Sequence, residues 1–255
     1  MRARHSAPSS SGGARSGRDG DARVLLARPA GAVVFDMDGV LLDTERLYTE
    51  ATQEIVSRFG KRFDWSVKAN MIGRLARDSA RYLVETLDLP MTADDYLRER
   101  EVLFRTLMPT AQALPGAREL TMALRAAEVP IAVATSSARP LYDLKTSRHG
   151  PWFAEFDVVL TGDDPRIARG KPAPDIYLLA ARELGTDPVR CVAIEDAPAG
   201  VEAARAAGMQ VIAVPDPALG RERVAAADVV LDSLVGLRPA DLGFAGVASS
   251  SGPRA

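Results

Sequence analysis

The sequence predicts an α/β protein: a doubly wound parallel sheet with a small helical module inserted after its first strand. Two observations lead to this prediction. From residue 112 to residue 245, short apolar runs alternate with helical patterns, an order typical of a parallel sheet that helices cover on both faces. Residues 45–111 instead hold helical patterns without a convincing strand. The chain has 255 residues, 47% of them hydrophobic, which is enough for one such domain and an insert.

The two ends of the chain lack an apolar pattern. Residues 1–29 are rich in Ser, Gly, Ala and Arg, and we expect a disordered tail there, with a second, flexible tail at residues 246–255. The first tail lacks the apolar centre of a secretory signal. Its Arg-rich, acid-poor start also resembles an organellar transit peptide, so a targeting segment stays open beside the cytoplasmic location that we expect.

The elements of the sheet domain follow one another along residues 30–44 and 112–245. The first strand is the apolar run Ala32–Phe35. Further strands are predicted at residues 130–134, 157–160, 191–194, 210–214 and 228–231, and helices at 116–127, 174–184 and 200–207. Pro109 and the Pro115-Gly116 pair mark the return from the helical module to the sheet. Sites in such sheets lie beyond the carboxyl ends of the strands.

Composition excludes several classes of protein. The formal net charge is -2 and the basic residues are dispersed, so nothing indicates binding to nucleic acid or to an anionic membrane. No apolar stretch approaches the length that a bilayer requires. The single cysteine, Cys191, lies in an apolar run and is expected to be a buried thiol in a reducing compartment. We therefore expect a small-molecule partner, while the oligomeric state leaves no signal in the sequence.

Asp36 and Asp38 are the most informative residues of the chain. They follow the first strand directly, and carboxylates at alternate positions point roughly the same way. Gly39 allows a sharp turn and can leave its N–H open to an anion. The pair suits a hard cation and a phosphoryl group, although an Asp-x-Asp-Gly segment taken alone is equally compatible with a solvated loop or a helix cap.

Oxygen ligands for a metal ion follow two of the predicted strands. Asp36, a backbone carbonyl near Asp38, and Asp196 can bind a divalent cation, and phosphate oxygens and water would complete an octahedron. This set predicts Mg²⁺. Glu195 is either a second carboxylate ligand or a neighbour that supports Asp196, and both interpretations stay open.

The remaining polar residues at the strand ends suit phosphoryl transfer. Lys171 would balance the phosphate charge and help keep Asp36 ionised. Thr135 would donate its hydroxyl to the phosphoryl oxygens, unless it only caps a helix. Asp36 would attack the phosphorus, and Asp38 would protonate the leaving oxygen and later activate water. Further hydrogen-bond donors to the phosphoryl oxygens would be the backbone N–H groups of Met37, Asp38, Gly39 and Ser136.

Four segments in this order resemble the four motifs of the haloacid dehalogenase superfamily: residues 35–45, 134–137, 170–175 and 194–204. The resemblance covers the chain from about residue 31 to residue 238. It implies a Rossmann-like core, a helical cap inserted after the first motif, here residues 45–111, and magnesium as the cofactor. The residues and the resemblance together predict a phosphoric monoester hydrolase that works through an aspartyl-phosphate intermediate.

Within the superfamily, residues 144–149, 162–165 and 195–198 resemble both pseudouridine-5'-phosphatases and plant glycerol-phosphate phosphatases. Residues 135–137 favour the first group, whereas residues 63–66 and 170–175 favour the second. We expect pseudouridine-5'-phosphate as the substrate, with glycerol phosphate as the alternative.

Two other functions are less favoured. A phosphomutase of the β-phosphoglucomutase type would carry a cap arginine for its second phosphate where this chain has Ala76. A non-catalytic binding protein would be expected to lose part of the catalytic set, which is complete here. Arg74 in the cap is either an exposed helix charge or a contact to the substrate.

Overall fold

A six-stranded parallel sheet lies at the centre of the computed structural model, which describes residues 25–71 and 76–244. The strand order is β3-β2-β1-β4-β5-β6. The strands are β1 (Ala32–Phe35), β2 (Ile131–Ala134), β3 (Val158–Leu160), β4 (Cys191–Glu195), β5 (Gln210–Ala213) and β6 (Val229–Val230). The chain starts in the middle, adds β2 and β3 on one side, and then crosses to add the other three. This is the predicted doubly wound topology.

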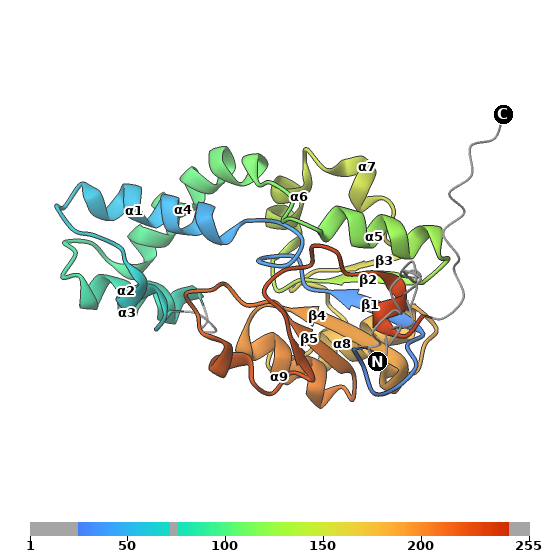
Figure 1. Ribbon diagram of the computed structural model, residues 1–255. Helices are drawn as coiled ribbons and strands as arrows, with labels where there is room; N and C mark the ends of the chain where they lie inside the picture. Colours follow the sequence, from blue (N-terminus) through green and yellow to red (C-terminus); the bar gives the residue numbers. More distant parts are fainter. Residues whose placement is uncertain (1–24, 72–75, 245–255) are drawn as a thin grey trace, which may run out of the picture.

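Alternating side chains of β1 explain why helices cover both faces of the sheet. Val33 and Phe35 belong to one buried apolar cluster, and Ala32 and Val34 belong to another. The covering helices are α5 (Ala117–Ala126) on the first face, and α8 (Asp175–Glu183) and α9 (Pro198–Ala206) on the second (Figure 1). Because both faces are apolar, the strand reads as an uninterrupted hydrophobic run.

The helical insertion lies between β1 and β2 and extends to one side of the sheet (Figure 1). Its helices are α1 (Glu45–Ser57), α2 (Trp65–Lys68), α3 (Ala76–Thr86) and α4 (Ala93–Leu107). Ile55, Leu83 and Tyr96 belong to a third apolar cluster, which is confined to this insertion. The insertion therefore has a small core of its own, and its described residues form no strand.

Two helices that follow β2 are absent from the predicted elements: α6 (Arg139–Thr146) and α7 (Gly150–Phe153). The three buried residues of α6 are Tyr142, Lys145 and Thr146. Such a face lacks the apolar spacing on which the prediction of helices depends. As a result, the sequence pattern does not reveal where Lys145 lies.

The N-terminal tail ends earlier than expected. Leu26 is buried, and the Leu25 N–H donates to the Asp241 carbonyl at 2.9 Å. The predicted disordered tail is therefore wrong for residues 25–29, because they pack against the sheet domain. Residues 1–24 and the tail at 246–255 lie outside the described residues. Within residues 25–71 and 76–244, no helix is long and apolar enough for a membrane span.

Candidate active site

Three carboxyl groups meet at the carboxyl ends of β1 and β4. Asp36 follows β1, Glu195 ends β4, and Asp196 comes next, and one ligand oxygen of each lies within 4.8 Å of the others. The two strands are paired in register, with Phe35 opposite Ile194, so they end at the same edge of the sheet. A set of carboxylate oxygens on this scale is the donor type that a hard divalent cation prefers.

Lys171 lies between two of these carboxyl groups. Its Nζ donates to Asp36 Oδ1 at 2.6 Å, to Glu195 Oε1 at 2.6 Å and to the Ala134 carbonyl at 3.0 Å. All three N–H bonds of the ammonium group are thus used. Glu195 Oε1 also accepts from the Tyr177 hydroxyl at 2.5 Å. Tyr177 therefore holds Glu195 in place, and Lys171 is held between Glu195 and Asp36.

In the acid cluster, which consists of Asp36, Glu195 and Asp196, the pKa values of the two aspartates are raised. Burial raises the pKa of Asp36 to about 7 despite the attraction of Lys171, and Glu195 and Asp38 add to the rise. Burial, followed by the charges of Glu195 and Asp36, also raises the pKa of Asp196 well above its usual value. A divalent cation among these oxygens would favour their ionised forms. The residues therefore fit Mg²⁺.

A different set of groups holds the carboxylate of Asp38. Its Oδ1 accepts from Thr44 Oγ1 at 2.6 Å and from Lys145 Nζ at 2.5 Å. Its Oδ2 accepts from Ser137 Oγ at 3.0 Å and from Thr135 Oγ1 at 3.3 Å. Burial alone would raise the pKa of Asp38, but Lys145 and the hydroxyl donors outweigh it and hold that pKa below its usual value.

The site has a charge balance that suits one divalent cation. Four carboxylates and two ammonium groups leave two negative charges when all of them are ionised. The groups are Asp36, Asp38, Glu195, Asp196, Lys145 and Lys171. An uncompensated buried charge is costly, so this excess is a further reason to expect a cation here.

Gly39 differs from the sequence expectation in one respect. Its N–H donates to the Leu42 carbonyl at 3.0 Å, so it is not open to an anion. The glycine is needed for another reason: its φ is +77°, and a Cβ at this position would overlap the carboxylate of Asp196. Gly39 thus allows Asp196 to approach the first loop closely.

The other expected phosphate contacts divide into two kinds. The backbone N–H groups of Met37, Asp38 and Ser136 have no hydrogen-bond acceptor among the described residues, as an oxyanion site requires. The Thr135 hydroxyl is engaged instead, because it donates to Asp38 and accepts from the Ser137 N–H at 3.0 Å. Arg74, the expected cap contact, lies outside the described residues.

Three side-chain contacts of Asp38 are absent from the sequence-based prediction, namely those with Thr44, Ser137 and Lys145. Hydrophobic patterns do not place Lys145, because lysine is almost never fully buried unless it is paired. A signal did exist for Lys145: residues 144–149 resemble a segment of both phosphatase groups.

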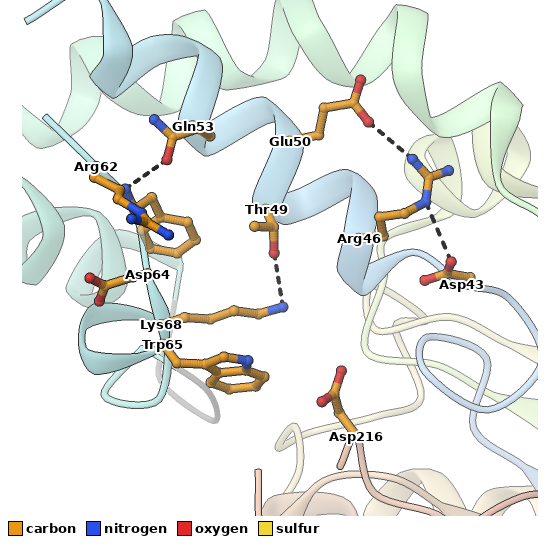
Figure 2. Close-up of a pocket in the computed structure, with 11 residues that line it drawn as sticks. Asp43, Arg46, Thr49, Glu50, Gln53, Arg62, Asp64, Trp65, Lys68 and Asp216 are labelled. Carbon is orange, nitrogen blue, oxygen red and sulfur yellow. Dashed lines mark hydrogen bonds and ion pairs between the residues drawn. The ribbon is translucent and has the colours of Figure 1, made fainter. Parts of the chain in front are cut away.

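A pocket of about 600 Å³ lies where the helical insertion meets the sheet domain (Figure 2). Thr49 on α1 and Lys68 and Trp65 on α2 line it from the insertion, and Asp216 lines it from the sheet domain. Lys68 Nζ lies 3.0 Å from the Oε2 atom of Glu45. Glu45 is among the acids that raise the pKa of Asp196, after burial and nearer acids. The lining residues do not include the three acids themselves, and Lys68 connects the pocket to Glu45, whose charge acts on Asp196.

Comparison with known proteins agrees with this geometry. The haloacid dehalogenase-like hydrolase family matches residues 30–208. The (DL)-glycerol-3-phosphatase 2 of Arabidopsis thaliana is 46% identical over 217 residues, which cover 83% of this chain and 90% of the plant protein. The "probable pseudouridine-5'-phosphatase" of Drosophila melanogaster is 44% identical over 214 residues, covering 83% of this chain and 93% of the fly protein.

Solved structures agree as well. A haloacid dehalogenase family hydrolase from Deinococcus radiodurans, with bound phosphate and sodium, has a TM-score of 0.71 at 32% identity. The match covers 85% of this chain and 97% of the other. With the family match and the plant and fly relatives, it shows that this chain belongs to the haloacid dehalogenase-like hydrolases, as a phosphatase of small phosphomonoesters.

Proposed function

We propose that the protein hydrolyses its phosphomonoester in two steps with magnesium, through an aspartyl-phosphate on Asp36. The observation that carries the proposal is the separation of the two aspartates. Asp36 lies in the acid cluster beside Lys171, whereas hydroxyl groups and Lys145 hold Asp38. One carboxyl group can therefore act as the nucleophile while the other handles the proton.

In the first step, an oxygen of Asp36 attacks the phosphorus. Lys171 holds Oδ1, and Oδ2 accepts no hydrogen bond from the described residues, so we assign the attack to Oδ2. The bond between phosphorus and the ester oxygen breaks, and that oxygen receives a proton from Asp38, which has to take up this proton first, against the attraction of Lys145. The backbone N–H groups of Met37 and Ser136 are free to stabilise the charge on the phosphoryl oxygens.

In the second step, Asp38 takes a proton from water, which attacks the phosphorus and releases phosphate from Asp36. Mg²⁺, when bound, would offset the charge of the phosphoryl group. Asp36, Asp196 and a backbone carbonyl near Asp38 would hold it. We assign Glu195 to fixing Lys171 rather than to the metal, because Lys171 and Tyr177 occupy Oε1 and the Asp196 N–H lies 3.1 Å from Oε2.

Trp65 bears on the choice of substrate. Its ring is covered by Lys68, with Nζ 5.0 Å from the ring centroid, and it also packs against the apolar cluster of the sheet domain. A uracil base would need an open aromatic face on which to stack. The pocket is otherwise lined mainly by charged and polar side chains, which suit a hydroxyl-rich leaving group. We therefore propose glycerol phosphate as the first candidate, ahead of pseudouridine-5'-phosphate.

Phosphate release with Mg²⁺ tests both parts of the proposal. We expect a higher kcat/KM for glycerol 3-phosphate than for pseudouridine-5'-phosphate, and the reverse order would overturn the choice of substrate. An acid quench after mixing with ³²P-labelled ester should leave a covalent label on the wild type and none on Asp36→Asn. A fully active Asp36→Asn protein would contradict the mechanism.

A further inference from the structure

We propose that Lys145 is a positioning residue for Asp38, and that it joins the proton-carrying carboxyl group to the first helix of the cap. The proposal rests on the proposed function, since Asp38 has a defined task only in that reaction. Lys145 belongs to α6, outside the four segments that resemble family motifs.

The ammonium group of Lys145 has a complete set of partners. Its Nζ donates to Asp38 Oδ1 at 2.5 Å, to Ser137 Oγ at 2.8 Å and to the Tyr48 hydroxyl at 2.9 Å. These three acceptors use all three N–H bonds. The side chain has 0% exposure, so water does not compete for them. A buried lysine with this many contacts holds one orientation.

Ser137 completes the geometry around the carboxylate. Its hydroxyl accepts from Lys145 and donates to Asp38 Oδ2 at 3.0 Å. Lys145 thus acts on one oxygen of Asp38 directly and on the other through Ser137. Losing the ammonium group would remove the direct bond and leave the Ser137 hydroxyl free to rotate. The Asp38 carboxylate would then sample several orientations.

Tyr48 links the same lysine to the cap. It lies in the first turns of α1, and its ring packs edge-on against Phe104 of α4, with centroids 4.9 Å apart. Lys145 Nζ also lies 5.0 Å from the centroid of the Tyr48 ring. Thr44, the residue before α1, binds Asp38 Oδ1 as well. The proton carrier therefore contacts the segment that leads into the cap, both directly and through Lys145.

The two buried lysines of the site bind different carboxylates, which supports a specific role for Lys145 at Asp38. Lys171 serves Asp36 and Glu195 in the acid cluster, whereas Asp38 is the carboxylate that Lys145 binds. A group that acts through another residue has no effect once that residue is gone, which makes the proposal testable by a double-mutant cycle.

The test measures kcat and KM for glycerol 3-phosphate in wild type, Lys145→Met, Asp38→Asn and the double variant. A positioned acid–base group contributes about 10²–10⁴-fold, and we expect Lys145→Met to lose about 10-fold to 100-fold of kcat with little change in KM. In the Asp38→Asn background, the same substitution should change kcat by no more than about 2-fold. Equal losses in both backgrounds, or an unchanged kcat, would overturn the proposal.

The leaving group gives a second readout. Nitrophenolate departs from p-nitrophenyl phosphate without needing a proton, so the first step does not require Asp38 as an acid. The burst of nitrophenol in Lys145→Met should stay within about 2-fold of wild type, while turnover of glycerol phosphate falls. A burst that slows as much as glycerol phosphate turnover would indicate a merely structural role and refute the positioning role.

Two further variants separate positioning from folding. Tyr48→Phe keeps the ring but removes one acceptor of Lys145, and should lower kcat in wild type but not in the Lys145→Met background. Thr121→Val is the control. Thr121 lies on α5, and its buried hydroxyl accepts a hydrogen bond from Trp152 Nε1 at 2.8 Å. Removing this hydroxyl should leave kcat unchanged. A wild type without phosphatase activity would instead refute the proposed function itself.

Discussion

Replacing Asp36 by asparagine should make the magnesium-free protein more stable at neutral pH while it abolishes turnover. Burial raises the pKa of Asp36 from its usual 3.8 to about 7, with Lys171 opposing and Glu195 and Asp38 adding to the rise. Between these values the folded protein holds a proton that the unfolded chain has released. The free energy of unfolding therefore falls as the pH rises from about 4 to about 7.

The size of this effect follows from the two pKa values. The interval from 3.8 to about 7, at about 1.4 kcal/mol for each pH unit, amounts to about 4 kcal/mol. An asparagine side chain carries no titratable proton, so the Asp36→Asn protein lacks this contribution. It also lacks the charge of Asp36 that adds to the raised pKa of Asp196, and this loss changes the difference in the same direction. The difference in unfolding free energy between variant and wild type should grow by about 4 kcal/mol from about pH 4 to about pH 8.

Urea unfolding followed by circular dichroism, in chelator and across this pH range, measures that difference. Saturating Mg²⁺ is the control, because a cation that binds the ionised carboxylate should flatten the wild-type curve and leave the variant nearly unchanged. Parallel curves for the two proteins in chelator would refute the reasoning, since they would show that the fold does not hold a proton on Asp36.

Three further predictions concern the same site. Lys171→Met leaves Asp36 and Glu195 buried without their cation; the unfolding free energy should fall by about 3–5 kcal/mol, measured by urea titration. Gly39→Ala forces a Cβ against Asp196 at a positive φ, and should raise the Mg²⁺ concentration needed for half-maximal activity while KM for the ester at saturating Mg²⁺ changes less. Chelation with EDTA should abolish phosphate release, and added Mg²⁺ should restore it; persistent activity in EDTA would contradict a metal-dependent reaction.

Much of the fold follows from the sequence because both faces of the sheet are apolar. Runs such as Ala32–Phe35 have to be buried, and their order along the chain predicts the topology. The acid cluster is predictable as well, because parallel strands bring their carboxyl ends to one edge. The hydrogen bonds of Thr135 and Gly39 were not predictable, since the partner of each group depends on which residues the folded chain places next to it.

The placement of Lys145 escaped prediction for a different reason. The helix α6 is short and its buried face consists of Tyr142, Lys145 and Thr146, so no apolar period reveals it. A lysine becomes buried only where an acid receives it, and that acid, Asp38, is 107 residues away along the chain. Pairing across such a distance is a property of the fold, which local sequence patterns do not contain.

The two lysines explain how neighbouring aspartates acquire different chemistry. Asp36 is buried and Asp38 is partly buried, and the loss of water contact alone would raise the pKa of each. Lys171 is shared between Asp36 and Glu195, so its attraction does not overcome burial and the charges of nearby acids, and the pKa of Asp36 rises. Lys145 and three hydroxyl groups donate hydrogen bonds to Asp38, and they hold its pKa below the usual value. Asp36 therefore remains the group that gains from a divalent cation, while the protein itself stabilises the carboxylate form of Asp38, which is the form that the proposed second step needs to take a proton from water.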